Sequence, residues 1–255
     1  MNTKLEAMKK AIARLPLVDK VTFSGAVPGE EVATFLSNRR KSDALKQNRL
    51  YEMLVCDPDY IDAYGLQLVA GRGFSEDYGD DVNKLVVNES AVRNLGIASN
   101  EEALGEEIEV ECTDAPMQII GVVKDYHQQA LNKNYTPIML IHKDKIGWLP
   151  QRYISIVMKS GDPKELVSQV EEIWHRYFED SSYDFFFLDQ FFDHQYRQDE
   201  VFGVMIGCFT GLAIFISCLG LWVLVMFSCT TRTKEMGIRK VLGATRWNLF
   251  YQLGK

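Results

Sequence analysis

The sequence predicts an α+β fold in two lobes, followed by one long transmembrane helix and a short cytoplasmic helix. Three observations support this. Residues 1–200 alternate between short strand-like and helix-like segments, residues 201–231 carry no charge, and a basic segment follows directly. The charge is divided in the same way: residues 201–255 carry +5, which leaves −12 for residues 1–200 out of the total of −7.

The elements of residues 1–200 follow from periodicity and from end signals. Apolar residues at helical spacing (Leu5, Met8, Ile12) predict a helix over 3–14. Alternating or β-branched runs predict strands at 20–24, 49–56, 84–88, 107–111, 117–124, 136–141, 153–158 and 183–188. Short helices are expected at 57–64 and 89–94, the second capped by Asn88, and Pro163 opens a longer one.

These elements suggest how the lobes divide. Residues 152–188 predict a strand–helix–strand unit, which we expect to pack beside the helix at 3–14 in a lobe made of 1–56 and 151–200. Residues 57–150 are rich in predicted strands, and we expect them to form a separate lobe.

The uncharged run predicts a membrane span. A helix needs about 20 apolar residues to cross the hydrocarbon core, and residues 201–231 exceed this. Basic residues follow the run and mostly acidic residues precede it. Because positive flanks stay cytoplasmic, we expect residues 1–200 outside the cytoplasm and residues 232–255 inside.

Three glycines in the run, Gly203, Gly207 and Gly211, repeat the G-x-x-x-G spacing. They lie on one helix face and permit close approach of another helix. The alternative is that glycine is simply common in membrane helices.

No motif for catalysis, for a cofactor or for a metal is present. The four histidines lack ligand spacing, and neither a phosphate-binding loop nor a nucleophile elbow occurs. Asp125 and His127 could form an acid–base pair, but a structural role is the better interpretation. The acidic stretch 75–81, SEDYGDD, lacks the order of a calcium loop and is expected to be a solvated surface loop.

The folded part is acidic, which argues against nucleic-acid binding. Cys56 and Cys112 could form a disulfide outside the cytoplasm, or both could remain free thiols.

The segment from Arg232 to Phe250, RTKEMGIRKVLGATRWNLF, is basic and twice interrupted by glycine. It resembles the cytoplasmic segment after the second membrane helix of FtsX-like (MacB-type) ABC transporter permeases, with the pattern R-x-K-E-I-G-I-R-K-x-x-G-A. The matching residues are Arg232, Lys234, Glu235, Gly237, Ile238, Arg239, Lys240, Gly243 and Ala244, and Met236 stands where the family has isoleucine. The resemblance implies a coupling helix that docks on a separate cytoplasmic ATPase.

The resemblance extends through the preceding residues. DPDYIDAYGLQLVAGRGFSED (57–77), VVNESAVRNLG (86–96) and IIGVVKDYHQQAL (119–131) are similar to the periplasmic part of the family, and FFFLDQFFDHQY resembles Bacteroidetes-type members. The family implies a porter-like lobe (1–56 and 151–200) and an inserted β-rich lobe (57–150) in the periplasm, anchored in the bacterial inner membrane. It also implies a dimer of permease halves, contact with membrane lipids, and room for a periplasmic protein partner.

We therefore expect a permease subunit that transmits ATP-driven motion to the periplasm, for export or mechanotransmission. It would have no catalytic residue, cofactor or metal of its own, because ATPase activity would reside in the separate subunit. The alternative is a single-span sensor or scaffold whose extracellular domain binds a ligand or a protein. The family's first membrane helix is not seen in the sequence, so we expect the chain to be a fragment of a permease.

Overall fold

The computed structural model describes residues 2–43, 48–78, 81–129, 134–179 and 181–241. The chain divides into two compact units, Met1–Phe192 and Asp193–Lys255, and each is described by itself. The nine strands of the described residues all belong to the first unit, here called the body. Most of the long helix α5 (Leu188–Val241) belongs to the second unit.

The body contains the remaining elements. In chain order they are α1 (Asn2–Ile12), β1 (Val18–Ser24), β2 (Phe35–Arg40), β3 (Arg49–Cys56), α2 (Tyr60–Ala63), β4 (Leu68–Gly71), the 3-10 turn η1 (Asp81–Asn83), β5 (Lys84–Asn88), α3 (Glu89–Asn94), β6 (Glu107–Val110), β7 (Met117–Val123), β8 (Ile138–His142), β9 (Tyr153–Met158) and α4 (Pro163–Tyr177). Side-chain caps begin two of the helices: Asn88 accepts from the Ala91 N–H, and Asp162 accepts from the Lys164 N–H.

Six strands close into a ring, here called the barrel. Strand β2 pairs with β6, β6 with β7, β7 with β5, β5 with β8, β8 with β3, and β3 returns to β2. The β3–β8 and β5–β7 pairs are parallel and the others are antiparallel. Strand β4 pairs with the second half of β7, beyond the part that pairs with β6.

Alternate residues of the six ring strands share one apolar core, as expected for the interior of a closed barrel. Its strand members are Leu36, Tyr51, Met53, Val55, Leu85, Val87, Ile108, Val110, Met117, Ile119, Val122, Met139 and Ile141. A second cluster covers the opposite faces of β3, β5 and β8 with α2 and the segment after β1.

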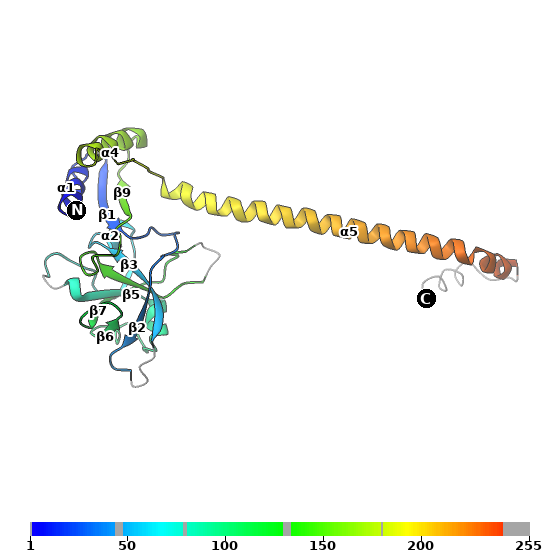
Figure 1. Ribbon diagram of the computed structural model, residues 1–255, viewed down its shortest axis with the longest axis horizontal. Helices are drawn as coiled ribbons and strands as arrows, with labels where there is room; N and C mark the ends of the chain where they lie inside the picture. The colour runs from blue at the N-terminus through cyan, green and yellow to red at the C-terminus, as the bar shows by residue number, and fades with distance from the viewer. Residues whose placement is uncertain (1, 44–47, 79–80, 130–133, 180, 242–255) are drawn as a thin grey trace. The chain divides into compact units, whose positions relative to one another are not determined.

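The other part of the body is a two-layer arrangement, here called the helical layer. Strands β1 and β9 pair antiparallel along their length, and α1 and α4 lie together beside them (Figure 1). A third apolar core, centred on Met8, Ile12, Val21, Val170 and Ile173, joins these four elements. The expectation that the unit of residues 152–188 packs beside the N-terminal helix is therefore confirmed for its first strand and its helix, β9 and α4.

The expected division into separate lobes must be corrected. One nine-stranded sheet runs through strands of both supposed lobes, because β3 pairs with β8 and β2 pairs with β6. The apolar cores divide near Gly25 rather than at residue 56: the third core takes its members only from residues 5–21 and 154–183. Local periodicity predicted a strand at 49–56, but it could not tell which distant strand would pair with it.

One predicted strand is wrong and two strands were missed. Residues 182–187 form no strand. Their aromatic rings instead contact one another and α4. The centre of the Tyr183 ring lies 6.1 Å from that of Trp174 and 5.8 Å from that of Phe185. The missed strands are β2, whose sequence FLSNRR has little apolar alternation, and the short β4.

Candidate functional site

The uncharged run lies within α5 as one helix. Residues Phe202–Thr231 are the candidate membrane span among the described residues, and none of its most apolar window is buried inside the protein. Thirty helical residues rise about 45 Å, against about 30 Å for the hydrocarbon core. The span is therefore long enough to cross with a tilt.

The three spaced glycines lie in the first turns of this span. A Cβ added at Gly203, Gly207 or Gly211 meets nothing within 4 Å in the described chain, the helix's own neighbouring backbone left aside. Residues four apart lie on one side of a helix, so the glycines form a strip that is open to a neighbouring helix.

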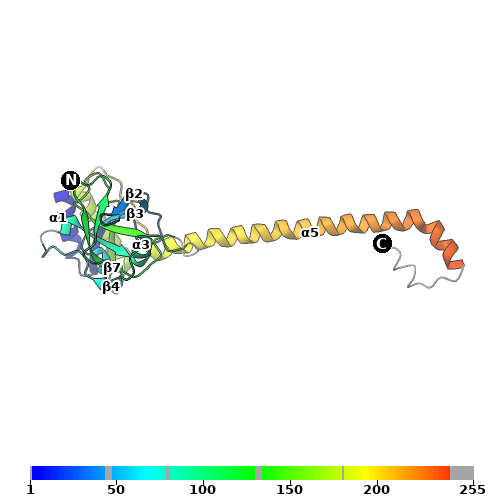
Figure 2. The same ribbon diagram turned by 90° about the horizontal axis from the view of Figure 1, so that it is seen from below.

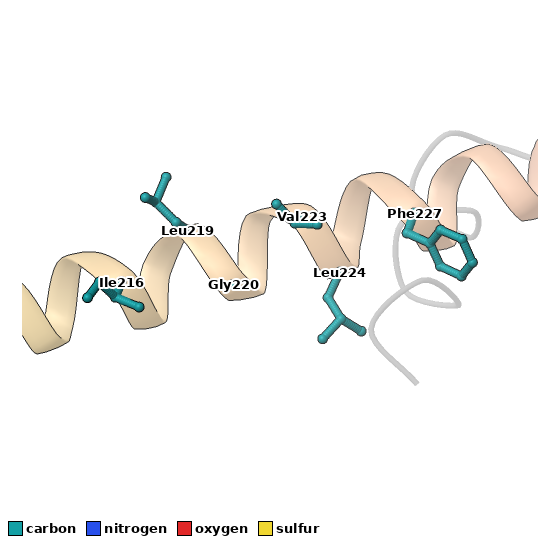
Figure 3. A pocket seen from close by; sticks show the side chains of 6 residues that line it. All are labelled: Ile216, Leu219, Gly220, Val223, Leu224 and Phe227. Atoms are coloured by element: carbon teal, nitrogen blue, oxygen red, sulfur yellow. The ribbon is translucent and has the colours of Figure 1, made fainter.

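A second apolar surface lies further along the span. Figure 3 shows a shallow hollow around Gly220, lined by Ile216, Leu219, Val223, Leu224 and Phe227. Every lining side chain is apolar and exposed. Such a surface suits lipid chains or another apolar helix rather than a polar small molecule.

Threonines mark the end of the apolar span. Thr230 and Thr231 both donate to the carbonyl of Phe227 at 2.9 Å, and Thr233 donates to the carbonyl of Cys229 at 2.7 Å. Hydroxyl bonds of this type bend helices by competing for the helical carbonyl. The last turns of α5 bend in this region (Figure 2).

The basic residues predicted to couple to an ATPase continue in the same helix. Arg232, Lys234, Glu235, Gly237, Ile238, Arg239 and Lys240 all lie within α5, whereas Gly243 lies outside the described residues. A separate short cytoplasmic helix is not found up to Val241. The reason is compositional, because Arg, Lys, Glu and Met favour helix and a single glycine costs only about 1 kcal/mol.

The acidic loop of the body is held more firmly than a solvated loop. Asp81 is buried and accepts two hydrogen bonds of 2.7 Å from Arg72 and one of 2.8 Å from the Ser75 N–H. The Arg72 guanidinium also lies 4.1 Å from the Tyr78 ring centre. The expectation of a solvated loop holds for Glu76 and Asp77, which are exposed, and is wrong for Asp81.

Asp125 and His127 do not form an acid–base pair with each other in the structure. Asp125 accepts from the Ser90 N–H at 2.8 Å, from the Ser90 hydroxyl at 2.9 Å and from Arg93 at 2.6 Å. The His127 ring packs on Tyr135 with the ring centres 4.5 Å apart. Asp125 therefore anchors the start of α3, a structural role.

The two cysteines of the body are both free. Cys56 is buried and Cys112 is exposed in the turn after β6. Burial raises the pKa of the Cys56 thiol well above its ordinary value, with a contribution from neighbouring Asp57, so this thiol stays protonated.

Sequence reasoning missed a fully buried carboxylate of the body, Asp57. The Asp57 side chain accepts from the Thr22 hydroxyl, from the Phe23 N–H at 3.0 Å and from Lys9 at 2.5 Å. Burial opposes the charge of Lys9, but the hydrogen bonds that Lys9 donates to Asp57 and Asp59, and the negative charges of these carboxylates, outweigh burial and raise the pKa of Lys9. The partners of Asp57 lie more than 30 residues away in the sequence, so no local sequence pattern could predict these contacts.

The fold and the span together define a class: a membrane protein whose folded mixed α/β domain precedes an apolar helix that continues into a basic end. Comparison with known proteins identifies the family. Residues 4–173 match the MacB-like periplasmic core domain, and residues 207–254 match the FtsX-like permease C-terminal family. The chain belongs to the FtsX/MacB-type ABC transporter permeases, as the resemblance of its motifs indicated.

Curated relatives agree with this family. The chain is 22% identical over 216 residues to the uncharacterized ABC transporter permease YvrN of Bacillus subtilis, covering 77% of this chain and 50% of that protein. It is 26% identical over 206 residues to the macrolide export ATP-binding/permease protein MacB of Aggregatibacter actinomycetemcomitans, covering 76% of this chain and 30% of that protein. The chain therefore spans about a third to a half of the length of these relatives.

A solved structure shares the fold of the body. The extracellular domain of the noncanonic ABC-type transporter YknZ from Gram-positive bacteria aligns with a TM-score of 0.51 at 16% identity, covering 67% of this chain and 82% of that chain. At this identity the likeness concerns the fold alone.

Proposed function

We propose that this chain is the part of an ABC permease that carries ATP-driven motion from a cytoplasmic ATPase to a periplasmic domain, for export or mechanotransmission. The observation that carries the proposal is the continuity of α5, which runs from the apolar span into the basic turns up to Val241. A helix held by its own backbone hydrogen bonds passes a displacement along its axis.

In this proposal the body is periplasmic and the basic end is cytoplasmic, with the span in the inner membrane. The charges of +5 and −12 on the two sides support that orientation. Arg232, Lys234, Arg239 and Lys240 would each add about 1 kcal/mol of attraction to anionic lipid near the inner surface. That attraction would keep the segment at a depth where an ATPase can reach it.

The coupling element would consist of Arg232, Lys234, Glu235, Gly237, Ile238, Arg239, Lys240 and Gly243. The family match over residues 207–254 supports this assignment. A helix that only lay in lipid would gain nothing from Gly237 and Gly243, whereas a helix that docks in a protein groove needs small residues for close approach.

The partners follow from the same proposal. The MacB relatives are named ATP-binding/permease proteins, and YvrN and YknZ are named permeases alone, which supports an ATPase acting beside this chain. A second permease half would pack on the strip formed by Gly203, Gly207 and Gly211. The periplasmic body leaves room for a protein partner outside the membrane.

The test compares two Gly→Leu variants in the permease co-expressed with its ATPase. Gly243→Leu should abolish stimulated ATP turnover and co-purification of the ATPase while membrane insertion is unchanged. The matched control is Gly147→Leu, at an exposed body glycine where an added Cβ meets nothing within 4 Å in the described residues. Normal ATPase binding and turnover in Gly243→Leu would leave the segment as a plain membrane anchor and overturn the coupling role.

A further inference from the structure

The apolar core of the helical layer shares no residue with the two apolar cores of the barrel. The core of the helical layer takes its members from α1, β1, β9, α4 and the segments next to them. The two cores of the barrel take theirs from residues 26–149. A body built as one rigid piece would bury apolar side chains across this boundary, because that is the main source of cohesion.

Mostly polar contacts join the helical layer to residues 25–152, while the Phe192 ring at the start of α5 also packs on Gly29. The polar contacts include the ion pairs Lys9–Asp57, Lys9–Asp59, Lys20–Asp62 and Glu6–Lys143, and the hydrogen bonds Tyr64–Ser155 and Tyr153–Glu30. In each of these contacts one residue belongs to the helical layer and the other to residues 25–152. Polar interfaces between parts of one chain are the ones that permit relative motion.

The backbone connection between the two parts is narrow. Strand β1 pairs with β3 at one residue pair, Ser24 with Cys56. The chain passes from one part to the other at Gly25 and again at Pro150, and these crossings lie side by side, since a Cβ on Gly25 would be 3.3 Å from the Pro150 carbonyl oxygen. Two adjacent crossings define an axis, as in a hinge made of a few element-terminal residues.

Buried hydroxyls line the same boundary. Ser24, Tyr60 and Tyr126 each bury a hydroxyl oxygen, and the Tyr60 hydroxyl lies against that of Tyr126 while the Ser24 hydroxyl lies against that of Tyr64. Tyr60 packs against Tyr64, whose hydroxyl donates to Ser155 of β9 at 2.7 Å. Hydroxyl groups of the two parts therefore meet at the boundary.

One carboxylate holds the two parts together. Asp57 follows β3 of the barrel, and its three donors, Lys9, Thr22 and the Phe23 N–H, all belong to the helical layer. From these observations we infer that the body contains a hinge at Gly25 and Pro150, about which the helical layer turns against the barrel, with Asp57 as the latch. The hinge is a property of the body and does not depend on ATPase coupling.

Hydrogen exchange on the unmodified full chain in detergent tests the hinge directly. The Asp57 amide donates to the Phe23 carbonyl at 3.1 Å and the Arg152 amide donates to the Ser24 carbonyl at 2.9 Å, both across the boundary. These amides should exchange at least about tenfold faster than those of the β3–β8 pairing, because they open without the barrel. Equal protection at both places would overturn the hinge.

A distance measurement tests the latch. Spin labels are placed on native Cys112 of the barrel and on Glu172→Cys, an exposed position of α4, with Cys208, Cys218 and Cys229 replaced by alanine. Asp57→Asn should broaden or shift the distance distribution of the folded chain. Glu106→Gln, which removes the 2.9 Å ion pair with Arg40 within the barrel, is the matched control and should leave it unchanged.

A folded Asp57→Asn chain with the parent distribution would overturn the latch. If that variant does not fold, the exchange rates of the unmodified chain decide the hinge by themselves.

Discussion

Asn88 satisfies three backbone groups with one buried side chain. Its carboxamide oxygen accepts from the Ala91 N–H and from the Ile138 N–H, both at 2.9 Å, and its amide donates to the Thr136 carbonyl at 2.7 Å. The residue therefore caps α3 and also ties β5 to the start of β8.

Asn88→Ala should lower the free energy of unfolding of the full chain by about 3 kcal/mol, the sum of a lost cap and unsatisfied buried groups. Urea denaturation in detergent measures it. Asn100→Ala is the control, because its amide makes one 3.3 Å bond to Glu89 in a partly exposed place, and it should cost little. Equal losses in the two variants would contradict the triple role of Asn88.

Asp81 makes the stability depend on pH. Hydrogen bonds from Arg72 are the largest cause that lowers the pKa of Asp81; burial opposes them and the Ser75 N–H adds to them. A lowered folded pKa means that the stabilisation is complete above the unfolded pKa of about 3.9 and is lost as the pH falls through the folded pKa.

Asp81→Asn should therefore flatten the fall in unfolding free energy between about pH 5 and pH 2. Denaturation at a series of pH values measures it, with Asp77→Asn in the exposed part of the same loop as the control. Curves of the same slope for Asp81→Asn and the parent would contradict this account.

At the scale of the element, α5 presents two unlike apolar surfaces. The glycine strip of residues 203, 207 and 211 is flat, while the surface around Gly220 is flanked by large apolar side chains (Figure 3). At 100° per residue, Gly207 and Gly220 lie on nearly opposite sides of the helix.

This difference predicts which side a neighbouring helix uses. Gly207→Ile should weaken helix association in membranes by about tenfold, which corresponds to about 1.4 kcal/mol, because the larger side chain keeps the two backbones from packing closely. Energy transfer between labelled chains measures it, and Gly220→Ile should have little effect. A larger effect at Gly220 than at Gly207 would assign the contact to the other side.

At the scale of the whole molecule, the division of charge predicts which side of the membrane each end occupies. Native Cys112 is exposed in the body and Ile238 is 64% exposed near the end of α5. In a chain whose span cysteines are alanine, a membrane-impermeant maleimide should label Cys112 in intact cells with a permeabilised outer membrane. Ile238→Cys, in a chain in which Cys112 is also alanine, should be labelled only after lysis, and the reverse pattern would invert the orientation.

Much of the local structure could be predicted from the sequence. The strands at 49–56, 84–88 and 153–158, the helix at 89–94 and the span depend on periodicity, caps and hydropathy within a few residues. The prediction of a strand at 183–188 was wrong, because the β-propensity of aromatic residues does not supply a neighbouring strand to pair with. In the described chain the ring of Tyr183 packs on Trp174 of α4 instead.

The sequence by itself determined the membrane span, the division of charge on either side of it, most element types and the family motif, because each of these depends on residues that lie close together along the chain. Only the tertiary structure decided that β2 and β3 belong to the barrel, that Asp81 is buried and that Asp57 joins two separate cores. The barrel and the contacts of Asp57 depend on distant pairings, such as Phe23 with Asp57, 34 residues apart, and Glu52 with Ile138, 86 residues apart. Such pairings form only when burial of the whole chain brings distant segments together.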